Sequence, residues 1–125
     1  MKEKIIQFAN KYISFFENEY RRSERAYYQF FDTEEFAQDC RAMGFEMDCG
    51  HSFTEVYGQE AWQNAQCIKD NIEKIKDINI IGSGLFSEWR YYKHWSYSHA
   101  NDDVIEWFLV LIRRLKELSE PEQQR

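Results

Sequence analysis

Residues 89–95, Trp-Arg-Tyr-Tyr-Lys-His-Trp, place aromatic rings and basic side chains next to one another. Aromatic side chains beside cations are enriched where proteins hold partners, and the same mixture forms stacking platforms for single-stranded nucleic acid. In a small domain, such rings more often belong to the core, while the cations reach solvent over buried stems. We therefore expect a mainly structural cluster with a binding rim. The candidate partner-binding residues of this block are Arg90, Tyr92, Lys93, His94 and Trp95.

Cys40, Cys49 and His51 are the nearest approach to a metal site, together with His94, His99 or Asp102. A closed zinc site usually shows two close pairs of ligands, and this spacing has none. Both cysteines are explained by burial on apolar faces. We expect no metal and no other cofactor.

Catalytic patterns are equally weak. Ser83 lies between two glycines, but neither the Gly-x-Ser-x-Gly elbow nor the phosphate-binding Gly-Lys-Ser sequence is present. His94 and His99 lie near Asp102, Asp103 and Glu88, which is a set that many sequences of this size contain. We predict no catalytic residue.

The charge of the chain is concentrated in one segment. The formal net charge is -6, and residues 30–60 carry eight acids against the single base Arg41, a local net charge of -7. A solvated face would explain this surplus, and so would a surface that attracts a basic partner. We expect at least five of the eight carboxylates to form one continuous negative surface. Its candidate partner-binding residues are Asp39, Glu46, Asp48 and Glu55.

The length of 125 residues and the 43% hydrophobic content fit one domain over residues 1–125, with residues 120–125 as a frayed tail. Three cysteines form no paired pattern, which favours reduced thiols. We find neither a signal-peptide pattern nor an apolar run of membrane-spanning length, so we expect a cytoplasmic protein without membrane contacts.

Periodic apolar residues predict the helices. The first runs from residue 3 to about 20 and can extend to about 31, and the last covers 102–118. A third substantial helix is expected over 59–77. Two shorter helices are expected, one from Asp32 to Gly44 and one after a break at residues 82–84, where Ser83 would cap it. Phe86 and Trp89 should then face Phe108, Leu111 or Ile112, with Arg90 and Lys93 on the opposite side.

Alternating residues from Phe45 to Cys49, followed by the run 53–57, predict an antiparallel hairpin. Two strands alone are marginal, and residues 79–81 are the candidate third strand. The sequence thus predicts an α+β domain that is mainly helical and carries a hairpin or a three-stranded sheet.

Three stretches of the chain carry a resemblance. They are the sequence Gly-Phe-Glu-Met-Asp-Cys-Gly at residues 44–50, the sequence from Ile81 to Trp95, and the helix with Trp107 and Phe108. Over roughly residues 30–118 the chain resembles a group of small bacterial and phage proteins. This resemblance implies a bacterial or phage setting, and it supplies neither an activity nor a site residue.

These observations favour a non-enzymatic protein-binding module. We expect an inhibitor or immunity-type protein that meets a basic or nucleic-acid-binding protein through its acidic surface. The negative net charge of the chain argues against direct contact with nucleic acid. The alternative is a regulator that binds a small molecule or nucleotide, or an enzyme, with a pocket walled by Trp89, Tyr92, His94 and Trp95.

Overall fold

The structure is a computed structural model that describes residues 2–19, 29–45, 56–58, 60–96 and 102–120, apart from the side chains of residues 19, 62, 95 and 96. Its elements are α1 (Lys2–Ser14), the π-helical turn η1 (Phe15–Glu19), α3 (Glu35–Ala42), the 3-10 turn η3 (Glu60–Trp62), α5 (Ala65–Asp70), the 3-10 turn η4 (Ile72–Lys74), α6 (Ile78–Tyr91), the π-helical turn η5 (Tyr92–Ser96) and α7 (Asp102–Ser119). Residues 29–32 form a further helical turn.

The prediction of an α+β domain is wrong, because the described part of the chain is helical and contains no strand. Val56 and Tyr57, assigned to the second strand of the hairpin, are helical. Residues 79–81, the candidate third strand, belong to the first turn of α6. Residues 46–55, which make up most of the predicted hairpin, lie outside the described residues.

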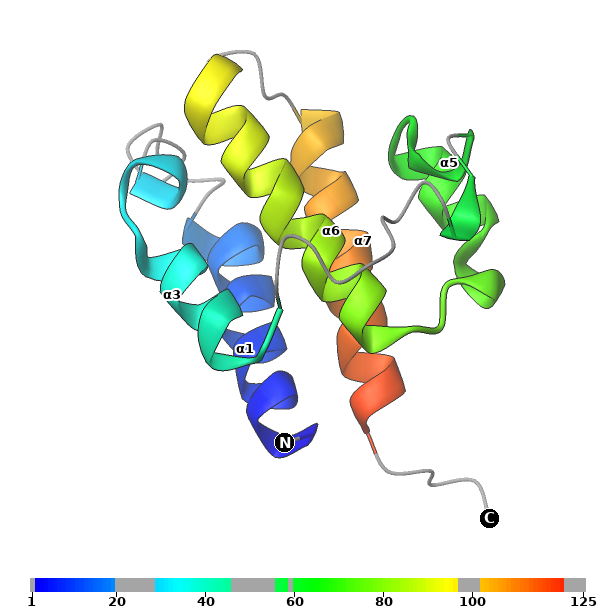
Figure 1. The fold of residues 1–125 in the computed structure, drawn as a ribbon, viewed down its shortest axis with the longest axis horizontal. Coiled ribbons are helices and arrows are strands. Elements are labelled where there is room, and N and C mark those ends of the chain that lie inside the picture. Colours follow the sequence, from blue (N-terminus) through cyan, green and yellow to red (C-terminus); the bar gives the residue numbers. More distant parts are fainter. Residues whose placement is uncertain (1, 20–28, 46–55, 59, 97–101, 121–125) are drawn as a thin grey trace.

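Helix α7 organises the fold, since α1, α5 and α6 all pack against it. Figure 1 shows α6 and α7 side by side in the middle of the molecule, with α1 and α3 to one side and α5 to the other. The acids Asp102 and Asp103 occupy the first turn of α7, where the helix dipole favours negative charge. The buried residues Ile105, Phe108, Ile112 and others follow at helical spacing. The sequence-based prediction of this helix is confirmed.

Helix α6 differs from the prediction, because it runs without interruption through Gly82, Ser83 and Gly84. Its N-cap is Asp77, whose carboxylate accepts hydrogen bonds from the backbone N–H groups of Asn79 (2.9 Å) and Ile80 (3.1 Å). Ser83 is therefore an interior residue of the helix and is buried. Glycine in a helix interior lowers the stability of the helix, and at Gly82 a packing contact with Phe45 offsets this loss.

The ring of Phe45 packs closely against Gly82 of α6. A Cβ atom at position 82 would overlap the ring of Phe45, so only glycine admits this contact. The end of α3 positions Phe45 through two backbone hydrogen bonds. The N–H of Phe45 donates to the carbonyl of Cys40 (2.9 Å), and the N–H of Gly44 donates to the carbonyl of Arg41 (3.0 Å). Gly44 has a φ of 79°, and the whole arrangement is a Schellman motif. The prediction that Gly44 ends this helix is confirmed.

Two other boundaries differ from the predictions. Asp32 does not begin a helix, because it lies in the helical turn 29–32, and α3 begins only at Glu35. The helix expected over 59–77 is divided into η3, α5 and η4. The amide oxygen of Asn64 accepts from the N–H of Cys67 (2.9 Å), and Asn71 donates to the Cys67 carbonyl (2.8 Å). Side chains that bond nearby backbone groups in this way compete with a continuous helix.

One hydrophobic core joins α1, residues 30–31, α3, α5, α6 and α7, and aromatic rings make up much of it. Phe30, Phe36 and Phe108 contact one another at centroid distances of 5.0 to 6.3 Å. Within the described residues, no helix has both the length and the apolar character that crossing a membrane requires.

Candidate functional site

Trp89 belongs to the core, as predicted. It is 1% exposed, and its ring lies near those of Phe36 (6.1 Å) and Phe86 (6.4 Å). The indole N–H donates a hydrogen bond of 2.8 Å to the carbonyl of Phe30. The ring of Phe36 on α3 lies beside Trp89, and α6 also packs against α7, the helix that the prediction named.

Lys93 connects η5 to the turn before α3. Its ammonium donates to the carbonyl of Phe31 (3.0 Å), pairs with Glu34 (3.3 Å) and lies 5.3 Å from the centroid of the Trp89 ring. The expectation that Lys93 faces away from the core is therefore wrong, and these contacts give it a structural role. Arg90 is exposed, as expected, and has no ion pair with another described residue.

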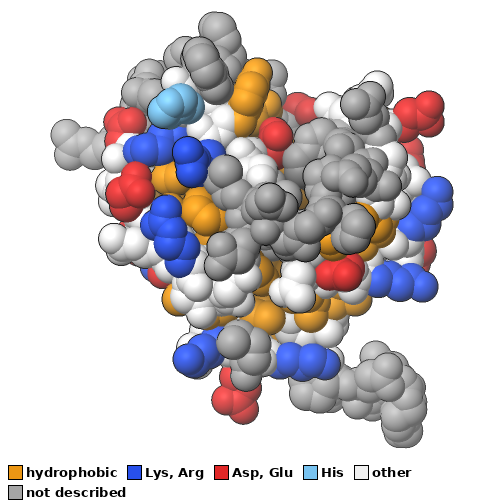
Figure 2. All heavy atoms as spheres, in the orientation of Figure 1, with side chains coloured by type: hydrophobic (Ala, Val, Ile, Leu, Met, Phe, Trp, Pro, Cys, Tyr) orange, Lys and Arg blue, Asp and Glu red, His pale blue; other side chains and the backbone are white. Residues whose placement is uncertain are grey.

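The rings of Tyr91 and Tyr92 meet edge to face, with centroids 5.1 Å apart. Tyr91 is 51% exposed, while Tyr92 is partly buried and lies 6.2 Å from Phe31. His94 is exposed. Figure 2 shows basic and acidic side chains close together on the face of the molecule that it draws. The side chain of Trp95 lies outside the described residues. Trp89, one of the four residues expected to wall a pocket with Tyr92, His94 and Trp95, is enclosed by the core.

The described acids of residues 30–60 fall into two places. Asp32, Glu34, Glu35 and Asp39 lie in or beside α3, whereas Glu60 lies in η3, which packs with α5. We call the first four the acidic face. Glu46, Asp48 and Glu55 lie outside the described residues. Two lysines partly neutralise the acidic face, since Glu34 pairs with Lys93, and Glu35 and Asp39 pair with Lys11.

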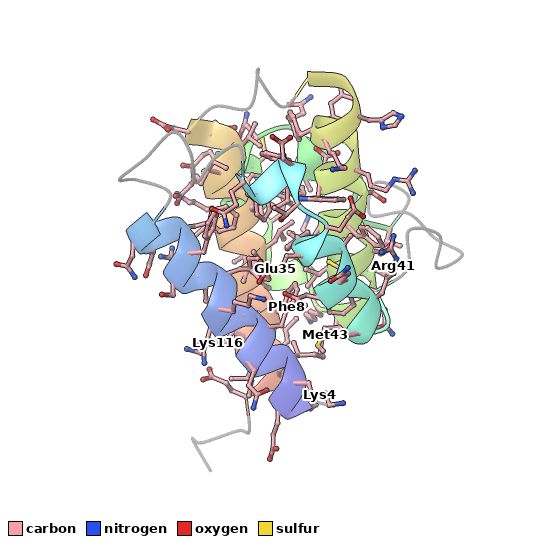
Figure 3. All side chains as sticks on the ribbon, turned by 90° about the vertical axis from the view of Figure 1, so that its left-hand side faces the viewer. Lys4, Phe8, Glu35, Arg41, Met43 and Lys116 are labelled. Carbon is pink, nitrogen blue, oxygen red and sulfur yellow. The ribbon has the colours of Figure 1, made fainter. Side chains whose placement is uncertain are left out.

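A pocket of about 400 Å³ opens beside the acidic face, between α1 and residues 29–36. Figure 3 shows α1 and α3 side by side, with Glu35 between them. Aromatic rings form the apolar part of the lining, and polar or charged side chains form the rest. The lining residues are Lys11, Tyr12, Ser14, Phe15, Gln29, Phe30, Thr33, Glu35 and Phe36.

The apolar wall is a continuation of the aromatic core. The rings of Phe15 and Phe30 are stacked, with centroids 5.8 Å apart and planes 28° from parallel. Tyr12 and Phe36 meet edge to face at 4.9 Å. Phe30 and Phe36 are almost completely buried, so the wall is held rigidly by packing behind it.

The charged edge of the pocket is a network on Lys11 and Asp39. The Lys11 ammonium lies 2.5 Å from Glu35 and 2.7 Å from Asp39, and 5.3 Å from the centroid of the Tyr12 ring. The Tyr12 hydroxyl donates a 2.6 Å hydrogen bond to the same Asp39 oxygen. Asp39 thus receives hydrogen bonds from both α1 side chains and fixes the distance between α1 and α3.

This network determines which groups carry charge. Burial, followed by the hydrogen bond to Asp39 and its negative charge, raises the pKa of Tyr12 far above its ordinary value, so the phenol stays neutral. Burial lowers the pKa of Lys11, but the hydrogen bonds and charges of Asp39 and Glu35 outweigh it, and the pKa is raised overall. The formal charges of Lys11, Glu35 and Asp39 sum to -1.

The hydroxyl groups of the pocket already have partners: Tyr12 donates to Asp39, Ser14 accepts from the side-chain amide of Asn18 (3.3 Å), and Thr33 donates to the Gln29 carbonyl (3.0 Å). The amide of Asn18 and the carbonyl of Gln29 are not bases, and the raised pKa of Tyr12 keeps its phenol protonated beside the Asp39 carboxylate.

Metal chemistry has no support in the described residues, where no three His, Cys, Asp or Glu side chains come together. Cys40 is buried in the core, and burial raises the pKa of its thiol, which disfavours the thiolate that a metal needs. Cys49, His51 and His99 lie outside the described residues.

The sequence did not reveal this pocket. Among its lining and network residues, only Asp39 was a candidate, while Lys11 and Tyr12 were assigned to a packing helix. The i,i+4 spacing of Glu35 and Asp39 places both carboxylates on one side of α3, which was the available signal. Nothing in the sequence indicated that α1 lies opposite them.

The chain was compared with protein-family models, with curated proteins and with solved structures, and no significant match was found in any of the three comparisons.

Proposed function

We propose that the protein is a non-enzymatic binding module of the inhibitor or immunity type, which acts in the cytoplasm and binds a basic protein through the acidic face. The observation that carries this proposal is the position of the pocket. A partly apolar socket of about 400 Å³ is lined by Glu35 and adjoins Asp39, which bonds to the lining residues Lys11 and Tyr12, so one surface offers both an anchoring site and negative charge.

The charge balance supports a basic partner. The four carboxylates of the acidic face are opposed by Lys11 and Lys93, which leaves a net charge of -2. The whole chain carries -6. Such a field raises the rate of encounter with a basic surface, and it disfavours nucleic acid. The aromatic wall then supplies contacts that hold the partner after encounter.

Site-specific photocrosslinking in the native cells tests this proposal. Gln38 is exposed on α3 between the acids, and Lys74 is exposed on η4 in the α5 region. A photoreactive amino acid at Gln38 should capture a defined basic protein that the same group at position 74 does not capture. The captured protein is then purified, and its association rate is measured against salt concentration. The rate should fall as salt rises, because screening weakens steering.

Two results would contradict the proposal. One is an identical set of adducts at positions 38 and 74. The other is a captured protein that is acidic, or whose association rate does not change with salt.

A further inference from the structure

We infer that the pocket between α1 and residues 29–36 is a socket for one arginine side chain of the partner, with Glu35 as the carboxylate that receives the guanidinium. This inference rests on the proposed function, and it names the chemistry by which the same face recognises its target.

The lining matches the two parts of an arginine side chain. An arginine combines an apolar stem with a planar, weakly hydrated head that stacks on aromatic rings. Phe15 is partly exposed and presents its ring to the pocket, and the nearly buried rings of Phe30, Phe36 and Tyr12 form the apolar wall behind it. The polar groups of Gln29 and Thr33 lie at the edge of the pocket, where a guanidinium has spare donors.

The charges select a cation. Lys11, Glu35 and Asp39 have a net charge of -1, and the Tyr12 phenol adds none because its pKa is raised. An anion entering the pocket would meet this net negative charge. A neutral side chain would gain only apolar contact. A cation gains both apolar contact and Coulomb attraction.

Glu35 can turn to a ligand without disrupting the network. It is 56% exposed and its recorded ion pair is with Lys11, whereas Asp39 also bonds the Tyr12 hydroxyl. When Glu35 pairs with a guanidinium, Lys11 keeps Asp39 as its counter-ion. Asp39 therefore acts as a positioning residue, and Glu35 is the residue that touches the ligand.

The geometry favours arginine over lysine. A guanidinium donates two parallel hydrogen bonds to one carboxylate and stacks flat on rings, whereas an ammonium is a compact, strongly hydrated charge. We therefore expect a guanidinium probe to bind about fivefold more tightly than an ammonium probe of equal length, an advantage typical of one extra charged hydrogen bond at a partly exposed site.

Four small probes test the inference by NMR on the labelled full-length protein: propylguanidinium, butylammonium, butanol and butyrate. The guanidinium should shift the signals of Gln29, Thr33 and the ring of Phe30 in a saturable way, and it should bind most tightly. Glu35→Gln should weaken it about fivefold, because the ion pair is lost while the exposed position tolerates the amide. Equal binding of butanol, or tighter binding of butyrate, would overturn the inference.

A pocket-filling variant and a matched control separate the pocket from the surface. Ser14 lines the pocket, and Asn10 lies one turn earlier on α1, exposed and outside the lining. Ser14→Tyr should abolish the guanidinium-induced shifts, and Asn10→Tyr should leave them unchanged. Equal shifts in both variants would show that the probe binds elsewhere and would overturn the inference.

The two proposals fail in distinguishable ways. If the crosslinked basic partner binds Ser14→Tyr as tightly as the unmodified protein, the arginine socket is wrong and the binding module stands. If propylguanidinium occupies the pocket and crosslinking at position 38 finds no basic partner, the socket chemistry stands and the proposed function is wrong.

Discussion

Replacement of Gly82 by alanine tests the contact that defines the middle of α6. Alanine would raise helix propensity by about 1 kcal/mol at an ordinary interior position. Here its Cβ would overlap the base of the Phe45 ring, which is 1% exposed. Either α6 shifts or the ring leaves the core. Overpacking costs about 1–3 kcal/mol, and loss of a buried phenylalanine costs about 3–5 kcal/mol. After the propensity gain, we expect Gly82→Ala to destabilise the fold by about 2 kcal/mol.

A double-mutant cycle isolates this contact. Phe45→Ala alone should cost about 3–5 kcal/mol. In that background the steric conflict is gone, so Gly82→Ala should stabilise by about 1 kcal/mol. Urea unfolding followed by circular dichroism gives the free energies of unfolding of all four proteins. The packing argument is refuted if Gly82→Ala stabilises the parent protein, or if its effect is the same in both backgrounds.

Three further predictions follow from the core and the network. Trp89→Ala should cost about 3–5 kcal/mol in urea unfolding, and Trp89→Phe about 2 kcal/mol, because the latter keeps a ring but leaves the Phe30 carbonyl without its donor; a loss under 0.5 kcal/mol for either variant contradicts the burial. Lys93→Met should lower the melting temperature more than Arg90→Met, because Lys93 donates a hydrogen bond to the Phe31 carbonyl and Arg90 is exposed. Equal melting temperatures would contradict the structural role of Lys93. Stability should fall as pH rises above about 10, the unfolded pKa of tyrosine, because the pKa of Tyr12 is raised in the folded state and the unfolded chain loses that proton first. Tyr12→Phe should flatten this part of the profile, and an unchanged slope would contradict the role of the Tyr12 hydroxyl.

The sequence predicted those elements whose signal is local. The long amphipathic pattern of α7, the acids at its first turn and the glycine after α3 all act within a few residues, and the structure confirms them. The burial of Trp89 followed from its spacing with Phe86 on one helix face.

The errors occurred where distant residues decide the local conformation. Gly82, Ser83 and Gly84 look like a helix break, but Phe45 fills the space that the missing side chain at 82 leaves, so the helix continues. Phe45 itself looked like the start of a strand, whereas it is the apolar residue that follows a Schellman motif. Asn64 and Asn71 interrupt an apolar pattern that otherwise reads as one long helix.

The candidate site was predicted only in part for the same reason. The charge pattern pointed to the segment that contains Glu35 and Asp39, but the pocket needs Lys11, Tyr12 and Phe15 from the opposite helix. Glu17 likewise pairs with Arg113 of α7, which is far from it in the sequence. Helix pairing is a tertiary property, and no local period encodes it.

The most direct test of the central claim measures how fast the crosslinked basic partner dissociates from three forms of the protein. These are the parent, the pocket-filled variant Ser14→Tyr and the matched variant Asn10→Tyr. If the pocket anchors the partner, Ser14→Tyr should dissociate at least about tenfold faster than the parent, as loss of a central anchoring contact does, and Asn10→Tyr should dissociate at the parent rate. Equal dissociation rates for all three proteins would contradict the claim that this pocket holds the partner.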